Sequence, residues 1–493
     1  MDELTPLSNA ALGQLSDTVR VPGYDRSRLS PGIVHIGLGN FHRAHQAWYL
    51  HRLFDAGLDQ DWAIVGAGVR SADGLQREKL LKQDCLSTLI ALDPSGSSAE
   101  VCGSMIDFLP VEEGNGALIR QMADPATRIV SLTVTEGGYY VAPATFGFDG
   151  AHPDMQHDAA HPDKPRTAFG AIIAALKARR KSHAGPFTCL SCDNLQGNGS
   201  VLKRTILSLA RLSDHDLADW IEARCTFPNS MVDCIVPATG PNEIARAATF
   251  GIADAAPVTH ETFRQWVVED AFCAGRPALE KVGVTFSDRV HDFEQMKIRI
   301  LNGGHQIIAP AGELLGLDTI AETMAHPKIR RLLQRVVENE VAPHVAAVSG
   351  YTPDDYLSLI LQRFSNPEIA DTTRRVAFDG SSRQPGFLLP SVRDSLSAGK
   401  SVEGLALVSA LWARYCAGTR EDGSDIAAND PEWRALNEKA QAAASDPSSW
   451  LQLAHVYGDL GNDPHFAEPF RDQLKRIYDK GVEAAIEAYL EAA

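Results

Sequence analysis

The stretch that decides the fold is Gly32-Ile-Val-His-Ile-Gly37-Leu-Gly39-Asn-Phe-His42-Arg43. It reads as a short buried strand that runs into a glycine-rich turn, and a helical stretch follows from residue 44 to about residue 56. Two glycines permit a tight turn and close approach of a pyrophosphate to the helix N-terminus. His42 replaces the third glycine of the usual G-x-G-x-x-G pattern. The pattern predicts a dinucleotide site, with a plain strand–helix turn as the alternative, and its predicted contacts are Gly37, Gly39, Asn40 and Phe41.

A second strand is expected over residues 61–66, as a strand–helix–strand unit requires. The acidic residue that binds the adenosine ribose should follow this strand, and the first acid there is Asp73. It comes later than the usual spacing of about 20 residues after the glycines. A carboxylate at this place favours NAD because it accepts from the ribose hydroxyls, whereas the neighbouring Arg70 leaves NADP open. Asp73 and Arg70 are therefore predicted cofactor contacts.

The rest of this half alternates strands and helices. Strands are expected over 87–92 and 100–107 as a hairpin, then over 128–135, 187–192, 263–270 and 282–286. Helices are expected over 115–122, 167–181, 199–212 and 214–223, and a loop rich in Pro, His and Asp over 143–165. Glu136 and Asn194 each follow a strand, at the edge where ligands bind in open α/β sheets. Glu136 is accordingly a predicted cofactor contact.

A second informative stretch is Glu294-Gln-Met-Lys297-Ile-Arg-Ile-Leu-Asn302-Gly-Gly-His305-Gln-Ile-Ile308. It is predicted to be one buried helix, because apolar residues surround its circumference. At about 100° per residue its polar side chains share an arc of about 140°, and they are Glu294, Lys297, Asn302 and His305. Such groups are costly to bury unless they serve each other or a ligand. Gly303 and Gly304, in the middle of this helix, lower helix stability by roughly 1–2 kcal/mol relative to alanine. Their presence indicates a close approach of another group to the backbone.

Length and composition set the fold class. A chain of 493 residues with 44% hydrophobic and 22% charged residues is typical of a globular protein with two large domains. From residue 288 onward the pattern is almost entirely helical, with loops over 379–386 and 418–431. We therefore expect an α/β chain with a Rossmann-type dinucleotide-binding domain over residues 1–285. A mainly α-helical substrate and catalytic domain should follow over residues 286–493.

Charge and cysteine usage restrict partners and compartment. The formal charge of −17 argues against nucleic acid or an anionic membrane as a partner. No apolar run approaches the ~20 residues that span a bilayer, and we expect a cytoplasmic protein. The eight cysteines lie in apolar contexts that indicate reduced, buried thiols. Cys189 and Cys192 form a C-x-x-C within an expected strand, so a zinc or redox role is the alternative for that pair.

Four motifs carry a resemblance to a known family. They are Gly37–His45, Thr135–Tyr139, Ser191–Asn194 and Lys297–His305. With these in order, the chain resembles the polyol-specific long-chain dehydrogenase/reductase family, most closely its mannitol 2-dehydrogenases, over nearly the full length. The resemblance implies a Rossmann-type domain, a helical second domain, an NAD(P) site and no metal. Ala72 stands where some relatives carry an acid, which again leaves the choice between NAD and NADP open.

The resemblance also implies roles for individual residues. Lys297 matches the general base, Asn194 and Asn302 the pair that binds the reacting oxygen, His305 a substrate-binding histidine, Glu294 the carboxylate of a proton path, and Asp233 and Arg375 substrate contacts. A structural ion pair is the alternative for Asp233 and Arg375, and a helix histidine that caps a carbonyl is the alternative for His305. His42 and His45 have metal-like spacing but lack a third ligand.

Elementary chemistry agrees with these roles. Lysine has a pKa near 10.4, and burial in an apolar helix face lowers it toward neutral pH. A matched base contributes about 10²–10⁴-fold to the rate. Glu294, one turn earlier, opposes that shift when ionised, yet it can pass the proton onward. Two carboxamide groups can stabilise the developing alkoxide, and losing one such donor costs about 10²–10³-fold.

Three functional hypotheses follow. The first is an NAD-dependent oxidoreductase that interconverts D-mannitol and D-fructose at C2, with D-arabinitol or D-sorbitol as further substrates. The second is a fructuronate reductase of the same family, for which Arg375 and Arg383 are the available cations. The third is a catalytically silent NAD-binding sensor. For the enzyme we expect an active site in the cleft between the domains, and a monomer or weak homo-oligomer.

Overall fold

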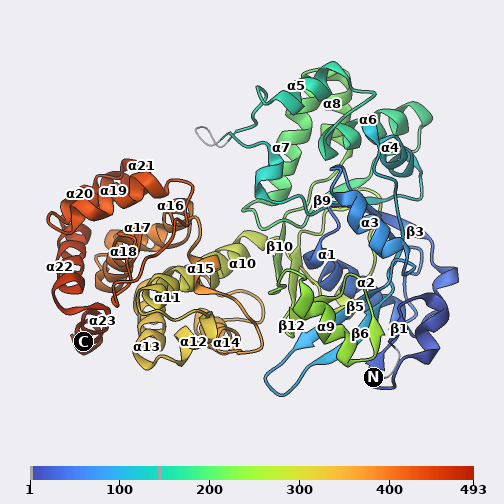
Figure 1. Cartoon of the computed structure of the whole chain (residues 1–493). Coiled ribbons are helices and arrows are strands. Elements are labelled where there is room, and N and C mark those ends of the chain that lie inside the picture. Colours follow the sequence, from blue (N-terminus) through green and yellow to red (C-terminus); the bar gives the residue numbers. More distant parts are fainter. Residues whose placement is uncertain (1–3, 143–146, 493) are drawn as a thin grey trace. The chain divides into compact units, whose positions relative to one another are not determined.

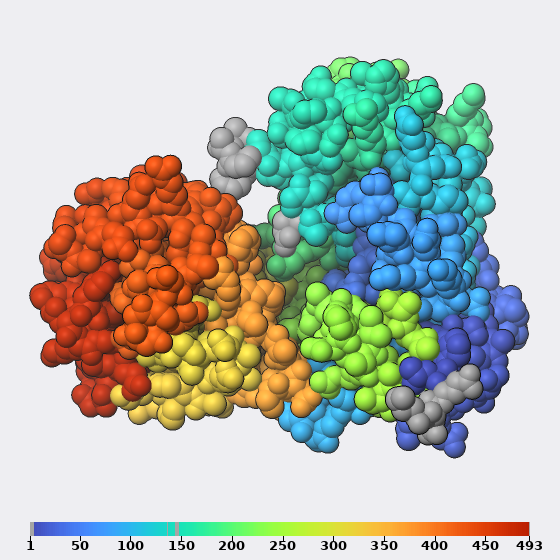
Figure 2. All heavy atoms as spheres, in the orientation of Figure 1, coloured from blue at the N-terminus to red at the C-terminus, as the bar shows by residue number. Residues whose placement is uncertain are grey.

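The structure, a computed structural model, describes residues 4–142 and 147–492, apart from the side chain of Glu136. The chain divides into two compact units, Met1–His291 and Asp292–Ala493. In Figure 1 the first unit runs from blue to green and the second from yellow to red, and the same colours mark their atoms in Figure 2. No helix within the described ranges is long and apolar enough to cross a membrane.

The first unit is built on a parallel sheet of five strands in the order β7-β4-β3-β8-β9. The strands are β3 (Pro31–Ile36), β4 (Ala63–Ala67), β7 (Met105–Phe108), β8 (Ile129–Leu132) and β9 (Thr188–Ser191). Numbered along the chain, the strands have the order 3-2-1-4-5 of a Rossmann sheet. The chain adds strands on one side of β3 first and then on the other, so the strand order reverses at β3. The register pairs Ile36 with Ala67 and with Leu132, so the carboxyl ends of these strands share one edge. The predicted α/β fold class is confirmed.

Helices cover both faces of this sheet. The α-helices of the first unit are α1 (Asn40–Ala44), α2 (Gln46–Asp55), α3 (Asp73–Leu81), α4 (Gly116–Ala123), α5 (Pro153–Ala160), α6 (Ala168–Ser182), α7 (Asn198–Arg211), α8 (His215–Arg224) and α9 (Pro241–Thr249). Val34 and Ile36 pack in one core cluster with Leu176 of α6, whereas Ile33 packs in another with Leu53 of α2. Successive strand residues therefore face opposite cores, as in a parallel sheet buried on both sides.

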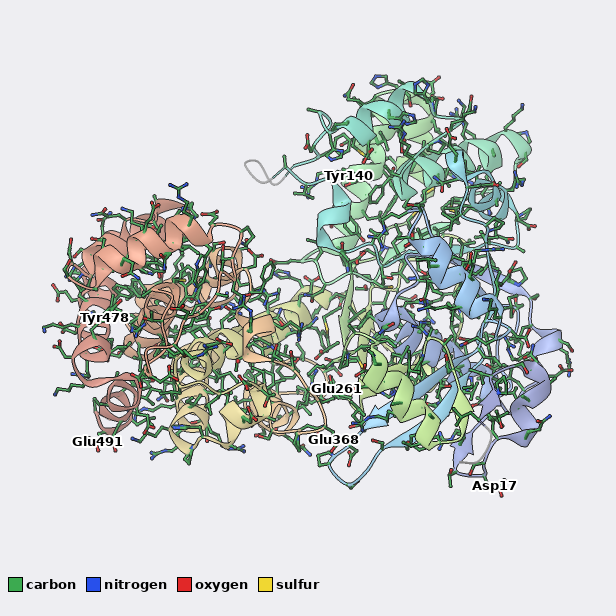
Figure 3. The ribbon with its side chains drawn as sticks, viewed as in Figure 1. Asp17, Tyr140, Glu261, Glu368, Tyr478 and Glu491 are labelled. Atoms are coloured by element: carbon green, nitrogen blue, oxygen red, sulfur yellow. The ribbon has the colours of Figure 1, made fainter. Side chains whose placement is uncertain are left out.

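Smaller sheets complete the first unit. Their strand orders are β12-β5-β6-β2, β10-β13-β14 and β1-β11. The strands are β1 (Thr5–Pro6), β2 (Val19–Arg20), β5 (Ser87–Leu92), β6 (Ser98–Cys102), β10 (Ser230–Asp233), β11 (Ile252–Ala253), β12 (Val258–Glu261), β13 (Gln265–Val268) and β14 (Thr285–Phe286). Glu261, labelled in Figure 3, accepts a hydrogen bond from the Ile235 N–H at 2.5 Å. That contact fixes the chain just beyond Asp233, the last residue of β10.

Two expectations for the first unit are wrong. The strand expected over 100–107 is broken at Gly103, where a side chain would meet the Arg26 Cδ at 2.9 Å, and its halves join different sheets. The loop expected over 143–165 contains α5, which begins with Pro153 at the first helical position behind the N-cap His152. Proline is favoured at that position because its missing N–H would have no partner there. Residues 143–146 of the expected loop lie outside the described residues.

The second unit is helical, as predicted. Its α- and π-helices are α10 (Val290–Met296, where the division between the units falls), η6 (Lys297–Asn302), α11 (Gly303–Leu314), α12 (Ile320–Ala325), α13 (Pro327–Val336), η7 (Val337–Val341), α14 (Pro353–Phe364), α15 (Thr373–Ala377), α16 (Gly380–Arg383), η9 (Gln384–Leu388), α17 (Leu389–Ser397), α18 (Glu403–Cys416), α19 (Trp433–Ala443), α20 (Ser448–Leu451), α21 (Ala454–Tyr457), α22 (Pro464–Lys480) and α23 (Val482–Glu491). One core cluster joins α11, α13, α18 and α22. The loop expected over 379–386 is wrong, because 380–388 forms α16 and η9.

Candidate active site

The glycine turn lies at the carboxyl end of β3 in the middle of the sheet. Gly37 has a φ of +91°, and a Cβ there would meet the Thr133 carbonyl oxygen at 2.2 Å. Gly39 is exposed, and a Cβ there would meet nothing closer than 4.0 Å. The first glycine is therefore required by the protein itself, whereas the second leaves open space beside the start of α1. This is the division of roles that a pyrophosphate-binding turn needs.

The side chains after the turn are largely used within the protein. Asn40 donates to the Pro237 carbonyl at 3.1 Å and to the Thr239 hydroxyl at 2.8 Å, and it accepts from Arg43 at 2.7 Å. Phe41 stacks on His45, with ring centroids 4.8 Å apart. Any contact of Asn40 with a cofactor is therefore expected from its backbone. A cleft of about 480 Å³ opens beside this residue, and its walls include Gln76 and Lys79 of α3.

His42 stands where the usual motif has its third glycine. Its ring stacks on His35 of β3, with centroids 3.4 Å apart and planes 11° apart. Burial lowers the pKa of both histidines, that of His35 to about 3, so both rings are neutral. A third glycine normally permits close helix–strand packing. Here the stacked rings of His35 and His42 provide that packing. In the sequence, the sign of this arrangement was His35 within the expected strand.

The predicted ribose contact, Asp73, caps the loop that follows β4. Its Oδ2 accepts from the backbone N–H groups of Val69 and Arg70, both at 3.0 Å. Its Oδ1 lies 3.4 Å from the guanidinium of Arg70, whose side chain is 73% exposed. Gly68 admits this carboxylate, because a Cβ there would meet the Asp73 Cβ at 2.3 Å. The roles of Asp73 and Arg70 toward a cofactor stay predictions.

The turn after β8 is held by Asp193. The Asp193 carboxylate accepts from the N–H groups of Val134 and Thr135 at 3.0 and 2.8 Å. It also accepts from the hydroxyl of the fully buried Tyr139 at 2.7 Å. This network fixes the backbone around Glu136, whose own side chain lies outside the described residues. It also fixes the exposed Asn194, the next residue along the chain.

Asn198 links the segments that carry Asn194, predicted to bind the reacting oxygen, and Asp233, a predicted substrate contact. Its buried carboxamide donates to the Asp193 carbonyl at 3.0 Å and to the Ser230 carbonyl at 2.8 Å, and it accepts from the Ser230 N–H at 2.9 Å. Ser230 begins β10, and Asp233 ends it with its side chain buried. Tyr139, Asp193 and Asn198 thus position Asn194 and Asp233. Sequence reasoning missed these roles, since nothing local identifies the partners.

In the second unit the predicted catalytic residues follow one another along a continuous helical run. Glu294 lies on α10, Lys297 and Asn302 bound the π-helix η6, and His305 lies on α11. Glu294 and Lys297 are buried. A π-helix closes its hydrogen bonds at the fifth residue and so winds by less than the α-helical angle per residue. The arc computed at about 100° per residue is therefore wrong for Asn302 relative to Lys297.

His305 is surrounded by ionic groups of its own unit. Burial lowers its pKa to about 4; Asp371 opposes this shift, and Arg375, Arg363 and Arg383 add to it. Arg375 makes a two-pronged ion pair with Asp371, at 2.6 Å and 2.5 Å. Asp371 is buried, whereas the Arg375 side chain is 66% exposed. The structural ion pair considered for Arg375 is present, and the structure places Arg375 in the electrostatic surroundings of His305.

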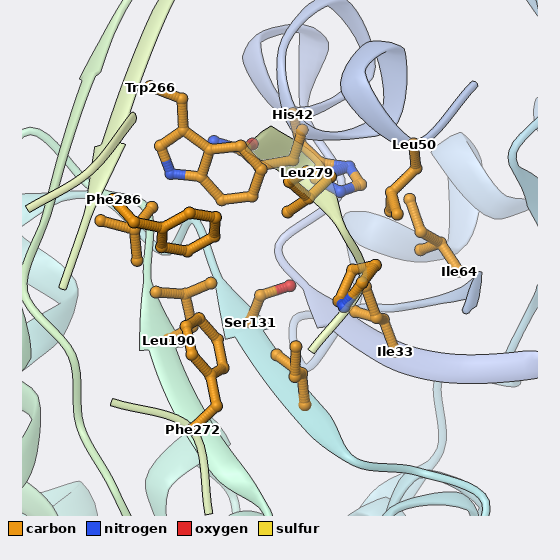
Figure 4. A pocket seen from close by; sticks show the side chains of 14 residues that line it. Ile33, His42, Leu50, Ile64, Ser131, Leu190, Trp266, Phe272, Leu279 and Phe286 are labelled. Carbon is orange, nitrogen blue, oxygen red and sulfur yellow. The ribbon is translucent and has the colours of Figure 1, made fainter. Parts of the chain in front are cut away.

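A second cavity of the first unit is lined by side chains of the main sheet and of strands β13 and β14 (Figure 4). Apolar side chains form most of its wall, among them Ile33, Leu190 and Phe286. Its volume of about 20 Å³ holds little more than one water molecule, so it is not a nucleotide site.

The eight cysteines form no disulfide with one another, and all but the half-buried Cys273 are buried, as predicted for most of them. Burial raises the pKa of Cys189 and Cys192. Among the described residues no group of three or more His, Cys, Asp or Glu side chains is arranged to hold a metal ion.

Two family models match the chain. Residues 31–281 match the mannitol dehydrogenase Rossmann domain, and residues 289–478 match the mannitol dehydrogenase C-terminal domain. The chain belongs to the mannitol dehydrogenase family. It is 55% identical over 478 residues to the mannitol 2-dehydrogenase of Cereibacter sphaeroides, which covers 97% of this chain and 100% of the relative. It is 39% identical to the mannitol 2-dehydrogenase of Pyricularia oryzae, with 97% of each protein covered.

Two solved structures agree with the fold. The ternary complex of Pseudomonas fluorescens mannitol 2-dehydrogenase with NAD and D-mannitol aligns with a TM-score of 0.87 and 39% identity, covering 99% of this chain and 100% of that one. The substrate-free D-sorbitol dehydrogenase aligns with a TM-score of 0.90 and 35% identity, covering 97% of this chain and 100% of that one. The predicted resemblance and the two-part architecture are therefore confirmed.

Proposed function

We propose that this family member is an NAD-dependent mannitol 2-dehydrogenase that interconverts D-mannitol and D-fructose. The observation that carries the proposal is the 55% identity, over essentially the whole chain, to a protein of that name. The complex of a 39% identical relative with NAD and D-mannitol supports the same cofactor and substrate. D-sorbitol is a natural further substrate to test, given the sorbitol dehydrogenase among the similar structures.

The first unit fits a dinucleotide. Gly37 holds the turn and Gly39 leaves it open, and the N–H groups at the start of α1 are suited to bind a pyrophosphate. NAD supplies the acceptor for the hydride that leaves the alcohol carbon. We assign the cofactor contacts to Gly37, Gly39, Asn40 and Phe41, and further to Arg70, Asp73 and Glu136. Asp73 favours NAD, while the exposed Arg70 makes NADP the alternative to be measured.

The second unit supplies the proton chemistry. We assign Lys297 as the general base, because a buried lysine in an apolar helix releases its proton more readily than one in water. Glu294, one helical turn earlier and also buried, passes that proton onward. We assign the stabilisation of the alkoxide to the carboxamides of Asn302 and Asn194, since neutral donors lower its energy without giving up a proton. No metal is needed for this assignment.

The remaining side chains set substrate binding. His305 is neutral at physiological pH, because its pKa is lowered to about 4, and it can donate to or accept from a polyol hydroxyl. Arg375 is held by Asp371 and still offers an exposed edge of its guanidinium. The carboxylate of Asp233, when ionised, can accept hydrogen bonds from substrate hydroxyl groups. We assign these three residues to substrate binding.

We further propose a cytoplasmic enzyme, a monomer or weak homo-oligomer, with a domain boundary near residue 285. Eight cysteines that form no disulfide with one another suit a reducing compartment. The boundary is supported by the two family-model ranges, which end at residue 281 and resume at residue 289.

A substrate panel tests the proposed function. Mannitol, sorbitol, arabinitol and mannonate would be oxidised with NAD and with NADP, following absorbance of the reduced nicotinamide, before and after dialysis against EDTA. We expect mannitol with NAD to give the highest kcat/KM, unchanged by EDTA. A tenfold preference for mannonate would instead make the protein a fructuronate reductase. NAD binding without turnover of any polyol would make it a sensor.

A further inference from the structure

The imidazole of His305 lies flat against the ring of Phe364. The two ring centroids are 4.1 Å apart and the planes differ by 14°. Phe364 is the last residue of α14 and is 3% exposed, so its ring is fixed in the core of the second unit. Rings stacked at this distance are in direct contact.

The neighbouring glycine lies beside this ring. A Cβ at Gly304 would lie 3.4 Å from the Phe364 Cε2 and 3.3 Å from the Leu333 Cδ1. Both side chains therefore pack beside the backbone of α11, one residue before His305. A Cβ at Gly304 would be in close contact with Leu333 and in van der Waals contact with Phe364.

No hydrogen bond to another described residue sets the orientation of the His305 ring. Its Nε2 is buried without a hydrogen-bond partner among the described parts of the chain. The terminal torsion of a histidine side chain is broad, so packing must fix the ring plane when hydrogen bonds do not. Among the described residues, the ring that stacks on His305 is that of Phe364.

We propose that Phe364 is a positioning residue, which holds the imidazole of His305 in the plane where it meets a polyol hydroxyl. The inference rests on the proposed function, because it takes His305 as a substrate contact. Gly304, one residue before His305, lies beside the same ring. Leu333 touches the same glycine from another side and serves packing alone.

Two substitutions of Phe364 test this inference in the full-length enzyme. Phe364→Leu and Phe364→Met remove the flat ring but keep apolar bulk, and methionine fills irregular space well. We expect KM for mannitol to rise about tenfold, kcat to change less, and the Kd for NAD to stay constant, because a misplaced binding group weakens substrate binding. Leu333→Ala is the matched control, with a lowered Tm and an unchanged KM.

A double-mutant cycle separates this inference from the proposed function. If His305→Ala leaves KM for mannitol unchanged, the role of His305 fails and the inference falls with it. If His305→Ala raises KM, then Phe364→Leu in that background should add nothing, because the ring it positions is gone. An unchanged KM in both Phe364 variants, or equal effects of Phe364→Leu and Leu333→Ala on KM, would overturn the inference and leave the proposed function intact.

Discussion

The Tyr139 hydroxyl donates to the Asp193 carboxylate across 2.7 Å, and the two residues come from the turns that follow neighbouring strands. The same carboxylate accepts the N–H groups of Val134 and Thr135. A buried carboxylate with three donors is well satisfied, whereas each donor would be costly to leave unpaired. These three hydrogen bonds therefore hold in place the edge of the sheet that carries Asn194.

Removing the Tyr139 hydroxyl should weaken that edge. Tyr139→Phe deprives Asp193 of one donor and Ser191 of a hydroxyl partner at 2.5 Å. We expect the free energy of unfolding to fall by about 1–3 kcal/mol, measured by urea denaturation. Tyr140→Phe is the matched control, because its hydroxyl makes a 3.3 Å bond to Asp154 from a half-buried position. Equal losses in the two variants would contradict the account.

Removing the carboxamide of Asn198 should destabilise the first unit. Asn198→Ala breaks its bonds to the Asp193 carbonyl and to both backbone groups of Ser230. We expect a loss of about 2–4 kcal/mol in unfolding free energy, because buried backbone groups lose their partners. Thermal unfolding with and without NAD measures this. A variant as stable as the wild type would show that the link is dispensable.

The two glycines of the turn should respond differently to alanine. Gly39→Ala adds a methyl that meets no protein atom closer than 4.0 Å, so Tm should hold while NAD affinity falls at least tenfold. Gly37→Ala forces a side chain onto the Thr133 carbonyl at a φ of +91°, so Tm and affinity should both fall, with a strain cost of about 1–3 kcal/mol. Calorimetry of binding and of unfolding separates the two. Unchanged NAD affinity in Gly39→Ala would place the pyrophosphate elsewhere.

Acid should destabilise the protein partly through His305. Its pKa is about 4 in the folded protein and about 6.5 when unfolded, so the unfolded chain binds the extra proton between these values. Neutral His305 contributes fully to the free energy of unfolding above pH 6.5. This contribution, roughly 3 kcal/mol in total, is lost as the pH falls to about 4. His305→Gln should therefore lose less stability than the wild type between pH 7 and pH 4. Parallel pH profiles of unfolding free energy would contradict this.

The main sheet could be predicted because its strands are short apolar runs that end in glycines and acids at one edge. The helices α5 and α16 could not, since their prolines and glycines were interpreted as loop signals, yet Pro153 begins a helix. Local sequence gives no sign of tertiary partners. For that reason the roles of Tyr139, Asp193 and Asn198 emerged only from the structure.

The second unit shows the same limit within one helix. Gly303 and Gly304 are unfavourable within a helix, which correctly indicated that other groups lie close to the backbone there, and the nearest side chains are Leu388 and Leu333. The π-helical turn from Lys297 to Asn302 had no signal, because a helical wheel assumes α-helical hydrogen bonds throughout. Such turns are frequent at functional sites. The roles assigned to Lys297 and Asn302 thus rest on chemistry and family membership rather than on the wheel.

The most direct test of the proposed mechanism is the turnover of mannitol by Lys297→Ala. A general base contributes about 10²–10⁴-fold, so kcat should fall by that factor while the Kd for NAD, measured by nicotinamide fluorescence, stays within about twofold of the wild type. Lys281→Ala, an exposed lysine on the chain just before the helix, is the control and should keep full activity. A Lys297→Ala enzyme that oxidises mannitol at more than a tenth of the wild-type rate would contradict the mechanism.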